Sequence, residues 1–220
     1  MGWTETENLR LDDAQKQGNA TEIWNILGGR GWSVNAVAAI LGNMQVESSI
    51  NPNVWEGYKV RPEDTSLGFG LVQWTPANKI RSWLRSNGYA VSSGSGQCHR
   101  LYLEMEEGLA GQYFINKNKL YPISRTAFIK STEAPQKLAS AFMYNYERPS
   151  AEAVRLSEAD RRKYAGDWYL YLSGVQPEPD PDPQPPPPSP SQSAGIYRNW
   201  NIVMHSAKRL NGQNKRDWFR

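Results

Sequence analysis

The residues best suited to chemistry are a glutamate at the end of an apolar helical pattern and a glycine-rich segment farther along the chain. The apolar residues recur at helical spacing and form one stripe, which Glu47 continues: Val37, Ile40, Leu41 and Met44. A carboxyl group on that face would lose hydration in its charged form, which favours the protonated form near neutral pH. The pattern therefore predicts that Glu47 is a general acid.

Cleavage of a glycosidic bond is the chemistry that such an acid would serve. It needs one carboxylic acid to protonate the leaving oxygen, and a second carboxylate or an activated water to meet the developing positive charge. Three acidic residues precede the glycine-rich segment, Glu56, Glu63 and Asp64. We favour Asp64, since the polar turn after it would keep it ionised, and Glu63 comes next. Alternatively, each of the three is a solvated loop charge.

The glycine-rich segment, 68–74, supplies residue types that can bind a sugar. Gly70 would let the backbone approach a ligand closely, and the Gln73 amide can both donate and accept hydrogen bonds. Trp74 could offer an apolar face to a pyranose ring, although core packing is the simpler explanation for this tryptophan taken alone. We predict that Gly70, Gln73 and Trp74 bind substrate.

A polar and aromatic cluster, residues 144–149, ends another predicted helix. Tyr144 is predicted to line the same site as a substrate-binding residue. Glu147 and Arg148 have two interpretations, either a structural ion pair with each other or part of the lining of the substrate cleft.

The elements that must position these residues are mostly helices. Helical patterns are expected over 20–27, 33–47, 79–86, 99–107, 133–146 and 157–172, with Ser33 as an N-cap and Ser157 with Asp160 as the start of the last helix. Residues 53–76 carry turn and strand character and predict a small β-hairpin region. The expected fold class is α+β, mostly helical with that small hairpin region.

Three motifs, at 47–52, 65–76 and 146–149, resemble the phage tail lysozyme domain family. The likeness is strongest to the N-terminal glycosidase half of the tail-knob wall-degrading proteins of small Bacillus podoviruses. It implies a lysozyme-superfamily fold and a muramidase that hydrolyses the MurNAc-β-1,4-GlcNAc bond of peptidoglycan. The family's catalytic glutamate corresponds to Glu47, whereas its second carboxylate has no clear counterpart here.

Other functions stay open on the same motifs. They also resemble lytic transglycosylases, in which one glutamate acts as acid and then as base. A non-catalytic glycan-binding or structural tail module is a third possibility. The tail-knob proteins continue into a zinc peptidase, but His99 and His205 are the only histidines here, too few for that site. We expect no metal and no cofactor.

Composition and charge limit which binding partners and which cellular location are expected for the chain. The net charge is +3, and the region before residue 175 is nearly neutral, which argues against nucleic-acid binding. Cys98 is the only cysteine, so no intrachain disulfide is expected. The chain shows neither a signal-peptide pattern nor an apolar membrane span. We expect synthesis in the host cytoplasm and action at the bacterial wall, as a virion tail component or as a lysis enzyme.

Domain organisation follows from a proline-rich stretch. We expect a lysozyme-like catalytic domain at 1–174, a linker at 175–194 and a basic C-terminal segment at 195–220. That last segment is either the start of a further module or a piece that docks onto other virion tail proteins or wall polymers.

Overall fold

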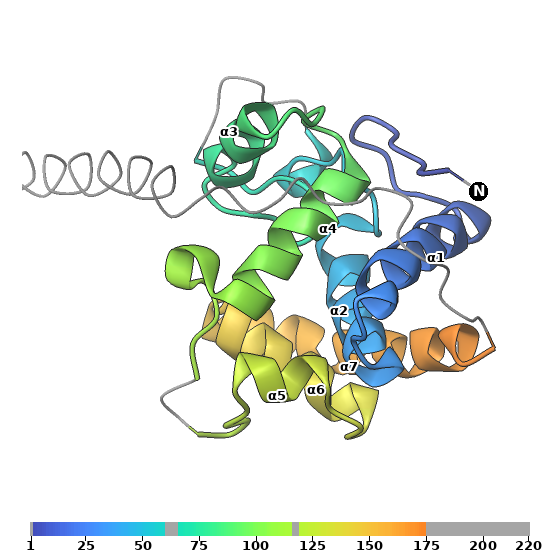
Figure 1. Cartoon of the computed structure of the whole chain (residues 1–220), viewed down its shortest axis with the longest axis vertical. Helices are drawn as coiled ribbons and strands as arrows, with labels where there is room; N and C mark the ends of the chain where they lie inside the picture. The colour runs from blue at the N-terminus through green and yellow to red at the C-terminus, as the bar shows by residue number, and fades with distance from the viewer. Residues whose placement is uncertain (1, 60–65, 116–118, 175–220) are drawn as a thin grey trace, which may run out of the picture. The chain divides into compact units, whose positions relative to one another are not determined.

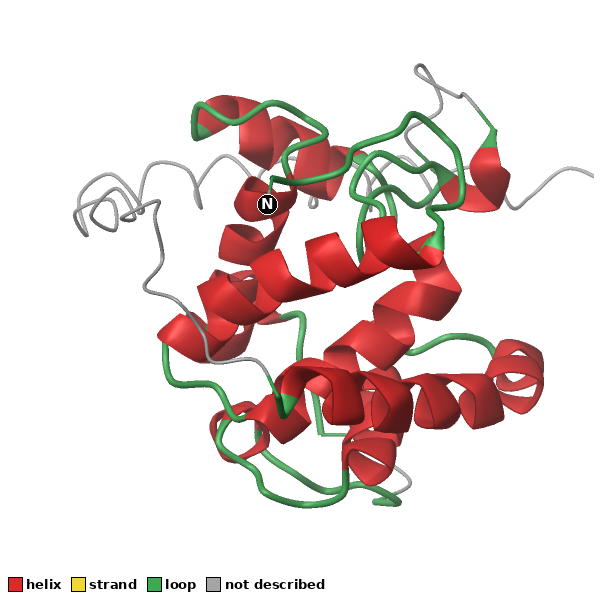
Figure 2. Ribbon diagram, turned by 90° about the vertical axis from the view of Figure 1, so that its right-hand side faces the viewer, coloured by secondary structure: helices red, strands yellow, loops and turns green. Residues whose placement is uncertain are grey.

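The computed structural model describes residues 2–59, 66–115 and 119–174, and the described part is built from helices joined by loops (Figures 1 and 2). The α-helices are α1 (Asp13–Gly29), α2 (Val34–Ser48), α3 (Asn78–Ser86), α4 (Gly94–Tyr102), α5 (Arg125–Ile129), α6 (Pro135–Phe142) and α7 (Ala151–Leu172). Two π-helical turns, η2 (Leu103–Glu107) and η4 (Met143–Glu147), extend α4 and α6, and short 3-10 turns lie at η1 (Glu56–Tyr58) and η3 (Leu109–Gly111). None of the described helices combines the length and apolar character that crossing a membrane requires.

Serine and aspartate side chains start most of these helices. Asp12 accepts a hydrogen bond from the Gln15 amide in a capping box at α1, and Ser33 caps α2 as expected. The expected start of the last helix at Ser157 is wrong. Helix α7 begins at Ala151 behind the N-cap Ser150, whose carbonyl accepts the Val154 amide at 2.9 Å. The Ser157 hydroxyl instead donates to the Ala153 carbonyl at 2.7 Å, inside the helix. A serine inside a helix can bond back to the preceding turn, so the same residue types do not fix the boundary.

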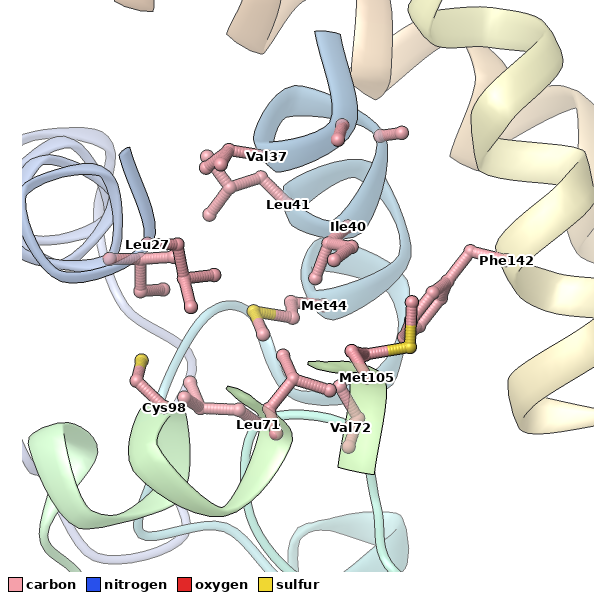
Figure 3. Packing of buried hydrophobic residues seen from close by; sticks show 14 of the residues in the cluster. Leu27, Val37, Ile40, Leu41, Met44, Leu71, Val72, Cys98, Met105 and Phe142 are labelled. Carbon is pink, nitrogen blue, oxygen red and sulfur yellow. The ribbon is translucent and has the colours of Figure 1, made fainter. Parts of the chain in front are cut away.

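The core is organised around α2. Its apolar side chains Ile40, Leu41 and Met44 are fully buried and lie between Leu27 of α1 and Phe142 of α6 (Figure 3). Burying an aliphatic side chain of this size contributes about 1.5–3 kcal/mol. The core therefore fixes α2 on several sides and determines where the end of this helix, with Glu47, lies.

Helices α2 and α7 pack closely because of one glycine. A Cβ atom at Gly42 would lie 2.4 Å from the Arg161 carbonyl oxygen and 2.7 Å from the Ala165 nitrogen, which is too close for any other residue. The Trp168 indole also donates to Gln45 Oε1 across this contact at 2.8 Å. The close approach brings the side chains of α7 within reach of the polar residues on α2.

The predicted β-hairpin region is not formed. Among the described residues of 53–76, Phe69 makes single antiparallel bridges to Trp55 and Trp74, and no continuous strand occurs (Figure 2). The bonds from Gly70 to the Val54 carbonyl and from Glu56 to the Gly68 carbonyl belong to the Trp55–Phe69 bridge itself. Beyond it the chain turns, since the Gly70 carbonyl accepts from the Gln73 amide and Leu71 donates to Gln97 Oε1. The α+β expectation is therefore wrong in its β part, and the described fold is helical.

The expected linker at 175–194 and the basic segment at 195–220 lie outside the described residues. The domain boundaries at 174 and 194 thus stay predictions from the sequence.

Candidate active site

Glu47 lies in the last turn of α2, at the edge of the core. The helix stops after Ser48 because Ser49 and Ile50 both turn to the left-handed region, each with φ of 57°. Asn19 holds this turn by donating to the Ile50 carbonyl at 2.9 Å. The Glu47 side chain is 22% exposed, so the expected buried position is only partly reached and the carboxyl group keeps a route to solvent.

A buried arginine joins Glu47 to a second glutamate. The Arg161 guanidinium of α7, 4% exposed, makes ion pairs with Glu47 Oε1 and with Glu147 Oε2 of η4. Arg161 also donates to Asn43 Oδ1 at 2.8 Å and to the Ser157 hydroxyl at 3.1 Å. Three elements, α2, η4 and α7, therefore meet at one cation, and we call Glu47, Glu147 and Arg161 the acid cluster.

Glu147 is the more buried acid of this cluster, with a side chain 6% exposed. Burial raises the pKa of Glu147 to about 8, with Arg161 acting to lower it and the nearby Glu47 carboxyl acting to raise it. Its Oε1 atom is buried and finds no hydrogen-bond donor among the described residues. Burial therefore favours the protonated form of Glu147, whereas Arg161 favours the ionised form.

The structure tests one of the two interpretations of Glu147 and Arg148, the ion pair between them. Glu147 pairs with Arg161, whereas the Arg148 guanidinium donates to the main-chain carbonyls of Asn145 and Tyr146 at 3.0 and 2.9 Å and lies over the Phe114 ring. The expected ion pair between Glu147 and Arg148 is wrong. Arg148 adopts a left-handed backbone conformation at the end of η4, with φ of 51°, and this turns it away from its neighbour.

Tyr58 of η1 is close enough to Glu47 to be affected by its charge. Burial raises the pKa of Tyr58, the nearby Arg10 lowers it, and the charge of Glu47 raises it further. The Tyr58 hydroxyl oxygen is buried and has no hydrogen-bond partner among the described residues.

The glycine-rich segment is tied to the end of α2. Ser48, next to Glu47, donates through its hydroxyl to the Leu71 carbonyl at 2.9 Å. Gly70 has φ of 83°, and a Cβ atom there would lie 2.4 Å from Gln97 Oε1. Gly70 thus serves the folding of the loop against Gln97, through conformational freedom and close approach.

Gln73 and Trp74, predicted to bind substrate, have structural contacts. The Gln73 amide nitrogen donates to the Gly70 carbonyl at 2.9 Å, while its buried Oε1 finds no donor in the described part of the chain. Trp74 is 3% exposed, and its indole donates to Glu104 at 3.1 Å. The Trp74 ring therefore lies in the core, where its face is not open to a sugar.

Tyr144 turns toward α7. Its hydroxyl donates to Glu158 Oε2 at 3.3 Å, and its ring stacks on Tyr121 with the centroids 5.5 Å apart. The acid cluster and Tyr144 are thus attached to the same helix at different positions, and a substrate contact by Tyr144 stays a prediction.

A second buried carboxylate, Glu104 of η2, is 1% exposed and forms a separate network. It accepts hydrogen bonds from Arg100 at 2.7 Å, from the Trp74 indole and from the Tyr146 hydroxyl. Both of its oxygens are therefore satisfied by donors. We call Glu104, Arg100, Trp74 and Tyr146 the structural cluster.

The candidates for a second catalytic carboxylate fall into two groups. Glu56 is exposed, and its Oε2 accepts a hydrogen bond from the Gly68 amide at 2.9 Å, which closes the loop between them. Glu63 and Asp64 lie outside the described residues, so their role stays a prediction.

Arg161 is the functional residue that the sequence reading missed. It lies on the buried face of α7 with Ala165, Trp168 and Leu172, at the helical spacing of an apolar stripe. A charged residue on such a stripe needs a buried partner. The spacing of Arg161 with Ala165, Trp168 and Leu172 is visible within the expected helix at 157–172 and is the signal that could have identified it.

The described fold is helical, with Glu47 at the end of a central helix and the neighbouring Ser48 bonded to the glycine-rich segment. This arrangement fits the lysozyme class of proteins. Residues 18–172 match the phage tail lysozyme family, and the chain belongs to this family. The chain is 37% identical over 169 residues to morphogenesis protein 1 of Bacillus phage B103. The matched region covers 77% of this chain and 43% of that relative, so the chain spans less than half of the relative's length.

Proposed function

We propose that the chain is a tail-associated muramidase that hydrolyses the MurNAc-β-1,4-GlcNAc bond of bacterial peptidoglycan, with Glu47 as the general acid. The observation that carries the proposal is the position of Glu47. It is the partly exposed member of an otherwise buried acid cluster, and Ser48 beside it bonds to the glycine-rich loop. Membership of the phage tail lysozyme family supports the substrate class.

In this mechanism Glu47 donates its proton to the glycosidic oxygen as the bond to the sugar carbon breaks. The developing positive charge is met by a second carboxylate or by a water molecule. Asp64 is our first candidate for that carboxylate and Glu63 the second, because both precede the loop that Ser48 holds. Gly70, Gln73 and Tyr144 are proposed to contact the glycan around this point.

A lytic transglycosylase is the second candidate, and one observation favours it. Glu56, the described member of the three loop acids, is engaged with the Gly68 amide. A mechanism in which Glu47 acts alone as acid and then base would need none of the loop acids.

Mass spectrometry of digested peptidoglycan tests the proposal. Reducing muramic ends are expected if the chain is a hydrolase. Anhydromuramic ends would contradict the hydrolase and support the transglycosylase. A purified, folded chain that releases no products would overturn both and leave a glycan-binding or structural tail module.

Amide replacement of the loop acids tests the second carboxylate. In a two-carboxylate hydrolase, Asp64→Asn or Glu63→Gln is expected to lower the rate by at least about tenfold, the lower part of the range for acid–base groups. Glu56→Gln is the matched control. If all three variants keep the wild-type rate while reducing ends are still formed, the second carboxylate lies elsewhere.

The basic segment at 195–220 is proposed to bind the wall or other tail proteins. A chain ending at Gly174 is expected to keep the melting temperature and its activity on soluble glycan fragments, and to lose activity only on intact walls. Raising the salt concentration should reduce the advantage of the full chain, since exposed charges are screened. Unfolding of the shortened chain would place the segment in the catalytic fold.

A further inference from the structure

Two carboxyl groups in the acid cluster compete for one cation. Arg161 is paired with Glu47 through one terminal nitrogen and with Glu147 through the other, and its remaining contacts are the neutral Asn43 and Ser157. If both glutamates were ionised, the cluster would hold a net negative charge next to the core. Burying an uncompensated charge costs several kcal/mol, so one proton on the pair is strongly favoured.

The hydrogen bonds point to the same proton. Glu47 and Glu147 bind the two terminal nitrogens of one guanidinium, which brings their carboxyl groups together. Two carboxylates are both acceptors and cannot bond to each other, whereas a carboxylic acid can donate to a carboxylate. Glu147 Oε1, which finds no donor among the described residues, is the atom that a proton would satisfy.

We propose that Glu47 and Glu147 act as one acid unit that shares a single proton, with Glu147 as the positioning residue that keeps this proton available to Glu47. The inference rests on the proposed function, because it concerns the proton that Glu47 delivers to the glycan. Glu147 itself touches no substrate in this scheme. The exposed end of the pair is Glu47 and the protected end is Glu147.

The pair loses one proton and regains one proton in each catalytic cycle. The proton passes from the pair through Glu47 to the glycosidic oxygen, which keeps the electron pair of the broken bond. Both glutamates are then ionised for a moment beside Arg161. The water that adds to the sugar carbon returns one proton to the pair, which restores the starting state.

The charged and titratable groups around the pair set its pH response. Arg161 faces it from α7 and favours the ionised forms, while each carboxyl group favours a retained proton on the other. The charge of Glu47 also acts on Tyr58 of η1, and Arg10 lies over the Tyr58 ring with its guanidinium carbon 4.6 Å from the centroid. Removing Glu147 therefore leaves Glu47 under the influence of a cation without the opposing carboxyl group.

The test is the pH profile of peptidoglycan cleavage by the full chain and by Glu147→Gln. In the variant, the alkaline limb of the rate profile is expected to move to lower pH by about one unit or more, the size of effect that a neighbouring charge produces. The variant would then nearly match the wild type at acidic pH and fall about tenfold below it on the alkaline side. Glu147→Asp keeps a carboxyl group and should restore most of the limb.

Glu106→Gln is the matched control, because Glu106 is a partly buried glutamate that accepts a hydrogen bond from the Trp32 indole outside the acid cluster. It should leave the limb in place. An equal loss of rate by Glu147→Gln at every pH, or an unchanged profile, would overturn the inference and leave Glu147 a purely structural residue. A wild-type chain that is inactive at every pH would instead overturn the proposed function.

Infrared spectroscopy of the wild-type chain gives an answer that needs neither activity nor a folded variant. The carbonyl band of a protonated carboxylic acid is expected at about pH 6 and should disappear by about pH 9, a range in which ordinary glutamates stay ionised. Its absence at the lower pH would show that the pair holds no proton and would overturn the inference.

Discussion

The acid cluster and the structural cluster both place a buried carboxylate next to an arginine, yet they differ in how completely the carboxylate is satisfied. Glu104 accepts from Arg100, Trp74 and Tyr146 and is closed off from solvent. Glu47 and Glu147 share one guanidinium, and one oxygen of Glu147 has no donor in the described part of the chain.

The difference teaches which buried carboxylate is built for packing and which for proton transfer. The carboxylate of Glu104 has a donor for each oxygen and is shielded from solvent, which suits a packing role. A pair that outnumbers its donors holds a proton, and in the acid cluster the partly exposed Glu47 can pass it on. A buried carboxyl group with a raised pKa, Glu147, next to a partly exposed one, Glu47, is therefore the useful mark of a catalytic position here.

The largest expected difference between the two clusters is the effect of an amide replacement on the cleavage rate. Glu47→Gln keeps the shape of the side chain and removes the proton donor, so the cleavage rate is expected to fall by about 10² to 10⁴. Cleavage assays together with a melting curve measure this. A folded Glu47→Gln chain with a rate within a few-fold of the wild type would remove Glu47 from the mechanism.

Glu104→Gln should show the opposite pattern. The change leaves Arg100 without its buried anion, and breaking such a pair is expected to lower the free energy of unfolding by about 3 kcal/mol. Denaturant unfolding measures this loss, while the rate per folded molecule should stay near that of the wild type. A large loss of rate in a stable Glu104→Gln chain would mean that the two clusters do not divide the roles in this way.

A smaller effect is expected in the pH dependence of stability. The folded-state pKa of Glu147 lies above its ordinary value of 4.5, so the folded state binds more protons and loses stability as the pH rises toward about 8. Glu147→Gln removes this titration. The difference in unfolding free energy between variant and wild type should shift in favour of the variant by about 1 kcal/mol or more over that range. Parallel stability curves would contradict the assignment.

Much of the helical framework could be predicted from the sequence, because local patterns determine it. The apolar spacing in α2 predicted both the helix and the placement of Glu47 at its end, and Ser33 was correctly expected to cap it. Three ordered motifs also predicted the family to which the chain belongs.

The absence of a hairpin was decided by contacts far apart in the chain. Gln97 Oε1 accepts the Leu71 amide at 2.8 Å, and the Gly70 carbonyl accepts the Gln73 amide at 3.1 Å, so pairing ends at the single bridge of Trp55 to Phe69. No local pattern around Gly70 reports that Gln97 lies beside it.

The acid cluster also depends on the tertiary structure, because its members are distant in sequence. The sequence by itself determined that Glu47 ends an apolar helix and that Glu147 follows a cluster of aromatic residues. Only the packing of α7 on Gly42 brings Arg161 to both glutamates. The physical reason is that spacing along the chain sets which face a residue occupies, whereas burial and the count of nearby donors, which decide where a proton resides, follow from the assembled core.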